Sequence, residues 1–188
     1  ILADPPGLGK TAQLLTSAEG RTLVVSPAML EDVWIEERQL WRPNLEMEWV
    51  SYSSLCDREG RKVKPVPKAD FRGRWDTIIF DESHYLKERN TNWTKAAMKL
   101  ESDRLFLATG TPLPNWAHEI FTSLKMIHAD QAKSGQEYGS YWRWVAKWFE
   151  TQQNRFNAHA RDIGDLQPWW TWDQFSVENG LDQKWLRR

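Results

Sequence analysis

Residues 2–11, which read LADPPGLGKT, decide the fold of this chain. The apolar residues 1–3 before them are expected to end a strand, and residues 11–18 after them to form a helix. A glycine-rich turn between a strand and a helix directs backbone N–H groups and the positive end of the helix dipole to one point, which suits a triphosphate. The predicted phosphate-binding residues are Gly7, Leu8, Gly9, Lys10 and Thr11.

The chemistry of this loop is carried by its last two residues. Lys10 is expected to reach the β- and γ-phosphates of ATP, and Thr11 to offer its hydroxyl to Mg²⁺. The strict phosphate-loop pattern has Gly where this chain has Asp4, and Pro5 and Pro6 stiffen the entry to the loop. A glycine-rich turn that merely precedes Lys-Thr is the alternative, so the interpretation needs a partner elsewhere in the chain.

An acidic segment after a short apolar strand supplies that partner. Residues 77–80 are apolar and β-prone and run directly into Asp81, Glu82, Ser83 and His84. A strand that ends in two acids places both at the carboxyl edge of a parallel sheet, where ligands bind in such folds. Asp81 is expected to hold Mg²⁺, and Glu82 to orient or deprotonate the water that attacks the γ-phosphate.

A solvated acidic strand end without a catalytic role is the alternative interpretation of these acids, because such strand ends are common. Their position 71 residues after Lys10, in the expected order, favours nucleotide hydrolysis over that alternative. His84 is expected to help bind the nucleotide and to bridge its site to later elements, with local packing or capping as the alternative.

The order of apolar runs along the chain predicts an α/β fold. Short β-prone runs alternate with helical stretches in the first half, which is the pattern of a mostly parallel central sheet flanked by helices. Strands are expected at residues 22–26, 48–52, 77–80 and 104–108. Helices are expected at residues 31–41, 92–100 and 116–127.

The sequence changes in character after Ala129, where no further strand is predicted. The chain of 188 residues has 13 tryptophans, and many of them lie in this part. Several aromatic residues there recur at helical spacing. The sequence thus predicts a domain at residues 1–130 and a Trp-rich helical extension at residues 131–188. Packing is favoured over base stacking for these aromatics, with Trp144 and Trp170 as the stacking candidates.

Composition places weaker limits on function. A formal net charge of −1 gives no global polycation, so a nucleic-acid surface has to be local. Residues 57–74 hold seven basic and three acidic residues, and Pro65 and Pro67 predict an irregular loop there. The lone Cys56 excludes an intrachain disulfide and fits a reducing, intracellular compartment, and no apolar run approaches a membrane span.

Five motifs in order resemble those of the Swi/Snf-like ATPases of helicase superfamily two. Residues 2–11 are similar to motif I of that family, usually Leu-Ala-Asp-Glu-Met-Gly-Leu-Gly-Lys-Thr, with Pro5-Pro6 in place of Glu-Met. Residues 23–30, followed by Trp34, resemble motif Ia, and residues 50–53 resemble a loose motif Ib. Residues 81–87 and 107–115 resemble motifs II and III, and residues 186–188 the Leu-Arg-Arg before the second lobe.

The resemblance implies the first RecA-like lobe of an ATP- and Mg²⁺-dependent motor. Its partners would be DNA, most readily duplex and without sequence preference, and a second RecA-like lobe carrying the arginine fingers. The implied nucleic-acid contacts are Ser26, Pro27, Ala28 and Tyr52, and the implied coupling residues are Thr109, Gly110 and Thr111.

We therefore expect an ATP hydrolase of the DNA-translocase type whose fragment of residues 1–188 is weak or inactive alone. A strand-separating helicase, a restriction-type motor subunit and a nucleotide-dependent binding switch remain as alternatives at this point.

Overall fold

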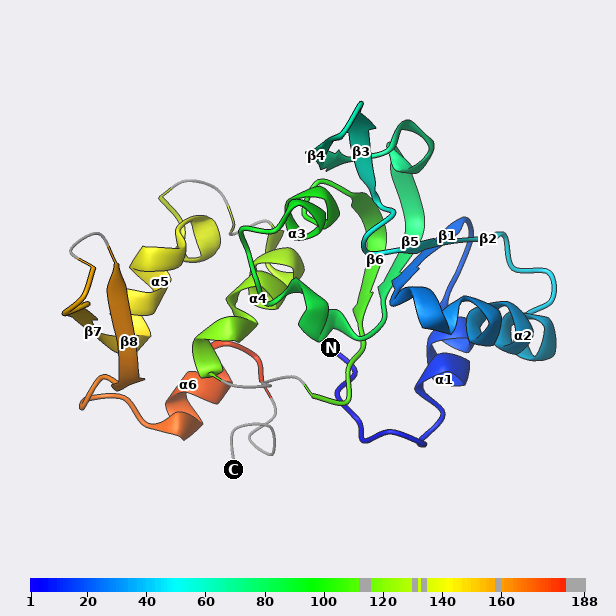
Figure 1. The fold of residues 1–188 in the computed structure, drawn as a ribbon. Coiled ribbons are helices and arrows are strands. Elements are labelled where there is room, and N and C mark those ends of the chain that lie inside the picture. Colours follow the sequence, from blue (N-terminus) through cyan, green and yellow to red (C-terminus); the bar gives the residue numbers. More distant parts are fainter. Residues whose placement is uncertain (112–115, 130–131, 133–134, 158–159, 182–188) are drawn as a thin grey trace. The chain divides into compact units, whose positions relative to one another are not determined.

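A parallel sheet of four strands, in the order β2-β1-β5-β6, forms the centre of the first part of the chain (Figure 1). The strands are β1 (Thr22–Ser26), β2 (Met47–Ser51), β5 (Arg74–Phe80) and β6 (Glu101–Leu107). All three pairings are parallel. Leu2 adds an isolated parallel bridge to Ala108 beyond the end of β6, which agrees with the strand end expected at residues 1–3.

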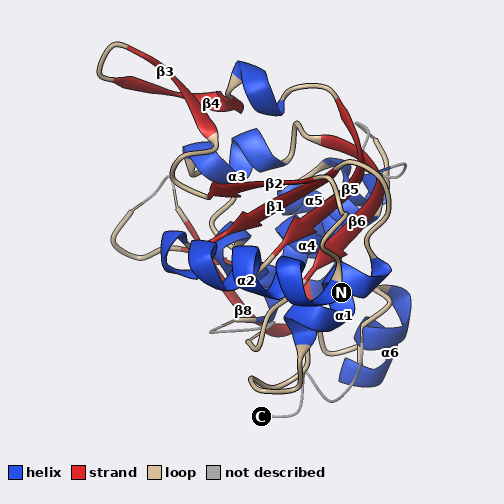
Figure 2. Ribbon diagram, turned by 90° about the vertical axis from the view of Figure 1, so that its right-hand side faces the viewer, coloured by secondary structure: helices blue, strands red, loops and turns tan. Residues whose placement is uncertain are grey.

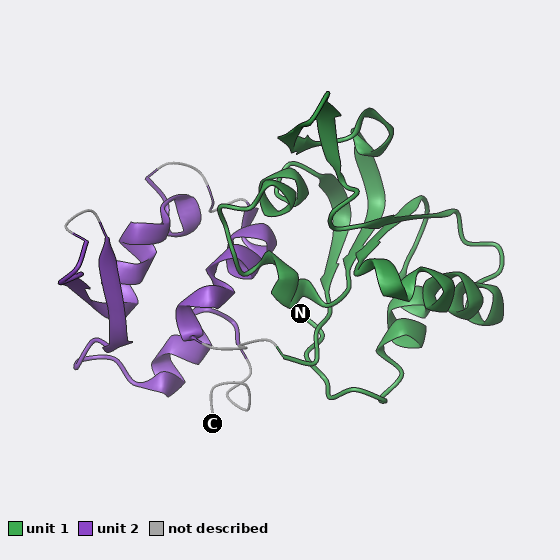
Figure 3. Ribbon diagram, in the orientation of Figure 1, with its two compact units in different colours: residues 1–114 green, residues 115–188 purple. Residues whose placement is uncertain are grey.

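The computed structural model describes residues 1–111, 116–129, 132, 135–157 and 160–181. Two compact units divide the chain, Ile1–Pro114 and Asn115–Arg188, and are coloured separately in Figure 3. Among the described residues, no helix has the length and apolar character needed to cross a membrane.

The two central strands of the sheet, β1 and β5, are apolar on both faces. Every residue of β1 is buried, and so are the last four residues of β5. Continuous apolar runs of this kind are typical of parallel strands covered by helices. The predicted α/β fold with a mostly parallel sheet flanked by helices is confirmed.

Helices α1 (Lys10–Ser17) and α2 (Glu31–Trp41) pack on each other and share one core with the sheet (Figure 2). Leu15 of α1 and Trp34 of α2 meet Val24 and Ile79 of the central strands in that core. Because all four side chains are fully buried, the starts of both helices are fixed relative to the carboxyl ends of β1 and β5.

The basic stretch predicted to be irregular is a β-hairpin instead. Strands β3 (Cys56–Glu59) and β4 (Lys62–Pro67) pair antiparallel, and Gly60 makes the turn with φ of 58°. The prolines of β4 are compatible with this hairpin because each strand of a two-stranded ribbon keeps one unpaired edge. Helix α3 (Asn92–Ala97) packs against β4, and a 3₁₀ turn, Ala69–Phe71, leads back to the sheet.

The second unit contains three α-helices, two 3₁₀ turns and a second hairpin within its described residues. They are the turn Ala117–Ile120, α4 (Phe121–Ile127), the turn Glu137–Gly139, α5 (Tyr141–Trp148), β7 (Phe149–Gln153), β8 (Arg161–Leu166) and α6 (Trp172–Glu178). The hairpin β7–β8 is a correction to the expectation of no strand after Ala129. Its strands are mostly polar and exposed, so they carry little of the apolar pattern that predicts a strand.

Aromatic side chains form the core of this second unit. Trp144 and Phe175 lie 5.9 Å apart between ring centroids, and Trp148 and Phe175 lie 5.1 Å apart. Trp144 is buried and its indole donates to the Asn179 side chain at 3.1 Å, so the stacking role considered for it is wrong. Trp170 packs on Trp148 and donates to the carbonyl of Lys147, which supports the packing interpretation.

Candidate active site

The carboxyl ends of the four parallel strands lie at one edge of the sheet, and each leads into a predicted motif. Residues 27–30 follow β1, residues 52–54 follow β2, residues 81–84 follow β5 and residues 108–111 follow β6. The bridge of Leu2 to Ala108 brings the phosphate loop to the same edge. The fold therefore gathers segments that are up to a hundred positions apart.

The phosphate loop ends where α1 begins. Gly7 and Gly9 have φ angles of 85° and 68°, in the left-handed region that only glycine adopts without strain. Gly9 caps α1, so the first N–H groups of that helix open into the loop. The Lys10 ammonium donates to the carbonyls of Asp4 at 2.8 Å and Pro5 at 3.1 Å.

The remaining loop residues leave the backbone accessible. Leu8 is exposed, and its carbonyl accepts a hydrogen bond from the Gln13 side chain at 2.9 Å. Thr11 lies half-buried in the first turn of α1. Exposed N–H groups at a helix start, next to one lysine, form a surface suited to phosphate oxygens.

The carboxylate of Asp81 is buried and both of its oxygens are held. Oδ2 accepts a hydrogen bond from the indole of Trp34 at 3.0 Å, and Oδ1 accepts one from the backbone N–H of Glu82 at 2.9 Å. Burial raises the pKa of Asp81 and the nearby Glu82 raises it further, whereas the two hydrogen bonds and the Lys10 charge lower it. The Lys10 charge is the smallest of these influences on the Asp81 carboxyl.

Glu82 has an unusual backbone conformation. Its φ and ψ of 48° and 49° make it the one non-glycine residue with positive φ in the described part of the chain. Such a conformation costs on the order of 1 kcal/mol and is concentrated at functional sites. It turns the Glu82 carboxylate toward His84, whose Nδ1 lies 3.1 Å from Oε2.

His84 joins the acidic segment to the segment after β6. Its Nδ1 lies 3.0 Å from the Thr109 hydroxyl and 3.2 Å from the Thr111 hydroxyl, and the Thr111 N–H donates to the Thr109 hydroxyl at 3.1 Å. The Thr109 hydroxyl also lies 3.4 Å from Glu82 Oε2. The structure thus brings His84, predicted to bridge the nucleotide site to later elements, together with Thr109 and Thr111, predicted to couple nucleotide state to nucleic acid. These roles stay predictions.

Gly110 links this network to the phosphate loop. A Cβ added at Gly110 would stand 3.3 Å from Cδ of Pro6, closer than an ordinary van der Waals contact. Pro6 is one of the two residues that depart from the usual motif I, so this departure is packed against motif III. Pro112 to Asn115, which complete the predicted motif III, lie outside the described residues.

The predicted nucleic-acid residues divide into buried and exposed ones. The Ser26 side chain is fully buried and its hydroxyl accepts a hydrogen bond from the Trp49 indole at 2.7 Å. Tyr52 is also buried, and its hydroxyl donates to the backbone carbonyl of Asp81 at 2.8 Å. Burial argues against phosphate contacts by these two side chains. Ala28 and its neighbour Met29, which is 83% exposed, form the accessible part of this segment.

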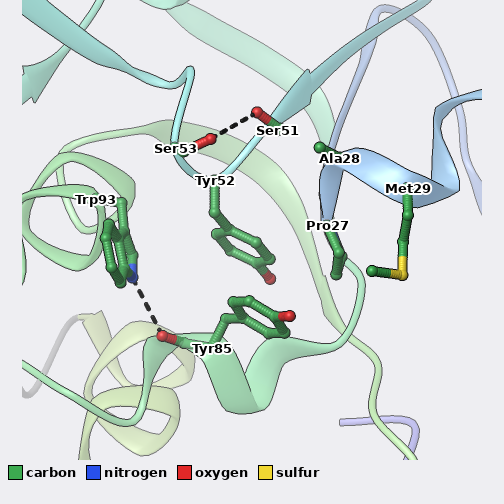
Figure 4. Close-up of a pocket in the computed structure, with 8 residues that line it drawn as sticks. All are labelled: Pro27, Ala28, Met29, Ser51, Tyr52, Ser53, Tyr85 and Trp93. Atoms are coloured by element: carbon green, nitrogen blue, oxygen red, sulfur yellow. Dashed lines mark hydrogen bonds between the residues drawn. The ribbon is translucent and has the colours of Figure 1, made fainter.

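A pocket of about 190 Å³ lies beside this segment (Figure 4). The rings of Tyr52 and Tyr85 stack in its wall, with centroids 5.3 Å apart and planes 3° from parallel. Trp93 donates from its indole to the Tyr85 carbonyl at 3.2 Å, and Met29 stands across from it (Figure 4). Pro27, Ala28, Ser51 and Ser53 complete the lining. Tyr52 therefore separates this pocket from Asp81.

A phosphate loop at a helix start and two acids after a parallel strand of the same sheet together define a P-loop ATPase lobe of the RecA-like class. The family model described as SNF2-related domain matches residues 49–162. The chain belongs to this family, and its first unit has the fold of the N-terminal lobe of a Swi/Snf-like ATPase.

Curated relatives and solved structures agree with this assignment. The chain is 28% identical to mouse (Mus musculus) "DNA annealing helicase and endonuclease ZRANB3" over 90% of its length. It is 33% identical to the Xenopus tropicalis "SWI/SNF-related matrix-associated actin-dependent regulator of chromatin subfamily A-like protein 1" over 68% of its length. It spans only 17% and 15% of these two proteins.

Among solved structures, the "Sulfolobus solfataricus SWI2/SNF2 ATPase core in complex with dsDNA" matches with a TM-score of 0.62 at 23% identity. The match covers 78% of this chain and 34% of that one. The "Sulfolobus solfataricus SWI2/SNF2 ATPase core domain" matches with a TM-score of 0.58 at 23% identity.

Sequence reasoning did not identify Trp34 and Trp49 as site residues, and it assigned Tyr52 a different contact from the one observed. Trp34 was noted only as the end of a motif, and the contacts of Trp49 with Ser26 and of Tyr52 with the Asp81 backbone were not foreseen. The available signal was chemical, because a buried indole N–H needs an acceptor and few acceptors lie in an apolar core.

The left-handed backbone of Glu82 predicts a difference between two substitutions. Glu82→Gly and Glu82→Ala both remove the carboxylate, but only glycine adopts this φ without strain. We expect the free energy of unfolding of the Gly variant to exceed that of the Ala variant by about 1 kcal/mol in urea denaturation. Equal stability of the two variants would show that residue 82 carries no strain.

The raised pKa of Asp81 predicts a pH-dependent gain from Asp81→Asn in protein free of Mg²⁺ and nucleotide. A raised pKa means that the native state disfavours the ionised carboxylate, a penalty that is absent below the ordinary value of 3.8 and complete above the raised one. The stability of the variant relative to the natural chain should therefore rise with pH as the natural carboxyl ionises, while the Asn NH₂ group, which cannot accept, loses one of the two hydrogen bonds at every pH. Urea denaturation of both proteins from acid to neutral pH tests this, and a stability difference that does not change with pH contradicts it.

Proposed function

We propose that this chain is the ATP-binding and ATP-hydrolysing first lobe of a DNA-dependent translocase that works together with a second RecA-like lobe. One observation carries the proposal. The loop of Lys10, the acids Asp81 and Glu82, and the network of His84 with Thr109 converge on the carboxyl edge of one parallel sheet. We propose that this lobe comprises residues 1–130 and that residues 131–188 are its extension.

The loop and the acids divide the binding of ATP and Mg²⁺ between them. Backbone N–H groups of residues 7–11 and the Lys10 ammonium would bind the β- and γ-phosphates. The Thr11 hydroxyl and the Asp81 carboxylate would hold Mg²⁺, which prefers oxygen ligands and takes few of them from the protein. No cluster of three metal-ligand side chains occurs among the described residues, and a site of this kind needs none. Bound Mg²⁺ supplies positive charge to the phosphate oxygens.

Glu82 acts on the attacking water in this proposal. The water oxygen attacks the γ-phosphorus, the bond to the bridging oxygen breaks, and Glu82 orients the water and takes up its proton. The strained backbone of Glu82 and the contact of its carboxylate with His84 support this role, because both fix where the carboxylate lies. A nucleotide-dependent binding switch would have no use for an acid held in this way.

Rapid turnover requires groups that we assign to the second lobe. An arginine finger contributes a factor of about 10³–10⁵ to the rate of phosphoryl transfer. We therefore expect residues 1–188 by themselves to bind ATP weakly and to hydrolyse it slowly. His84, Thr109, Gly110 and Thr111 would report the state of the nucleotide to the rest of the motor.

DNA is the proposed substrate of movement, because the Sulfolobus core forms a complex with dsDNA and the mouse relative is a DNA annealing helicase. Ala28 and Met29 are exposed directly after the buried Pro27, and their backbone N–H groups are the proposed phosphate contacts of this segment. Arg61 and Lys62 are exposed at the tip of the β3–β4 hairpin. Contacts with phosphates carry no sequence information and weaken as salt rises. A strand-separating helicase or a restriction-type motor would use the same lobe.

The test is the ATPase rate of the full-length protein with and without duplex DNA. We expect stimulation by DNA, its loss in Lys10→Ala, and a drop of about 10²–10⁴-fold in Glu82→Gln with ATP binding preserved. Glu36→Gln, at an exposed position of α2, is the matched control and should keep the natural rate. Turnover that ignores duplex, single strands and RNA alike would contradict the DNA part, and an active Glu82→Gln variant the role of Glu82.

A further inference from the structure

A hydrogen bond inside the core joins α2 to the acidic segment. The Trp34 side chain is fully buried, and its indole Nε1 donates to Oδ2 of Asp81 at 3.0 Å across 47 positions of sequence. A bond between a buried N–H and a carboxylate is stronger than one between neutral groups, because the acceptor carries charge. Removing the N–H would leave one side of a buried carboxylate without its partner.

Hydrogen bonds hold both the carboxylate and the main chain of Asp81. The Glu82 N–H holds Oδ1, and the Asp81 N–H donates to the carbonyl of Val25 at 2.9 Å in the next strand. The Tyr52 hydroxyl holds the Asp81 carbonyl. Trp34 is thus the side chain that fixes Oδ2, and the orientation of the carboxylate plane depends on it. Each oxygen keeps further lone pairs, since an ionised carboxylate has about four acceptor positions.

We propose that Trp34 is a positioning residue that orients the Asp81 carboxylate for Mg²⁺. The inference rests on the proposed function, because it takes Asp81 as the residue that holds the metal. A partner that holds a metal ligand in place is typically worth about 10- to 100-fold in metal affinity. Trp34 does not touch the nucleotide in this proposal, and it acts through Asp81 alone.

Packing alone is the competing explanation, and the chain offers a matched control for it. Trp75 in β5 is also fully buried, and its indole donates to the backbone carbonyl of Phe71 at 3.2 Å. Trp34→Phe and Trp75→Phe remove the same atoms and one hydrogen bond each from the same unit. A difference between them in Mg²⁺ binding reports the contact with Asp81.

The experiment measures how Mg²⁺ promotes binding of a fluorescent ATP analogue, mant-ATP, to the full-length protein. We expect Trp34→Phe to raise the half-saturating Mg²⁺ concentration about 10-fold or more, with mant-ATP affinity in the absence of Mg²⁺ unchanged. Trp75→Phe should leave the Mg²⁺ requirement at its natural value. Thermal unfolding of each variant identifies any loss of folded protein.

A second variant keeps the test decisive if Trp34→Phe does not fold. A benzothienylalanine at position 34 preserves the shape of the indole and lacks only its N–H, so it should show the same raised Mg²⁺ requirement. A natural Mg²⁺ requirement in this variant, or equal changes in the variants at positions 34 and 75, would overturn the role of Trp34. A natural protein that binds mant-ATP without regard to Mg²⁺ would instead overturn the proposed function.

Discussion

The parallel pairing of β1 with β5 is the constraint on which the site depends. Thr22 to Val25 pair in register with Thr77 to Phe80, so β5 delivers Asp81 at the height where β1 ends. The Asp81 N–H then bonds to the Val25 carbonyl, and the Ala108 N–H bonds in the same way to the Phe80 carbonyl. Because parallel strands share one direction, their functional loops meet at one edge without any further device.

Burial of polar groups at this edge of the sheet costs free energy unless hydrogen bonds hold them in place. Asp81 is 9% exposed, and a carboxylate at such a position requires hydrogen bonds to remain charged. Trp34 and the Glu82 N–H supply these bonds, and the Tyr52 hydroxyl holds the main-chain carbonyl of Asp81. Glu82 is held in a left-handed conformation directly beyond Asp81. Burial of Asp81 and the strained backbone of Glu82 thus cost stability at the two acids for which we propose a catalytic role.

Tyr52 gives the pocket near Met29 a connection to the nucleotide site. Its ring stacks on Tyr85 in the wall of the pocket, while its hydroxyl bonds to the Asp81 backbone (Figure 4). A ligand that displaces Tyr52 would therefore disturb the main chain next to both acids.

The fold was predictable because its signal is a repeated local pattern. The sequence predicts the sheet from the apolar runs of β1 and β5, and it predicts the loop from the glycines before Lys10. The β3–β4 hairpin escaped prediction because two prolines argue against a strand and only packing by α3 favours one. The partners of Ser26 and Trp34 depend on which way side chains turn in the core, and no single sequence carries that information.

The central claim is that the phosphate loop and the two acids form one nucleotide site in which Trp34 holds the Asp81 carboxylate. A crystal structure of the full-length protein with Mg²⁺ and a non-hydrolysable ATP analogue tests this most directly. We predict phosphates at residues 7–11, Mg²⁺ between the Thr11 hydroxyl and the Asp81 carboxylate, and the Trp34 hydrogen bond to Asp81 retained. A nucleotide bound elsewhere, or a metal held without Asp81, would contradict the account.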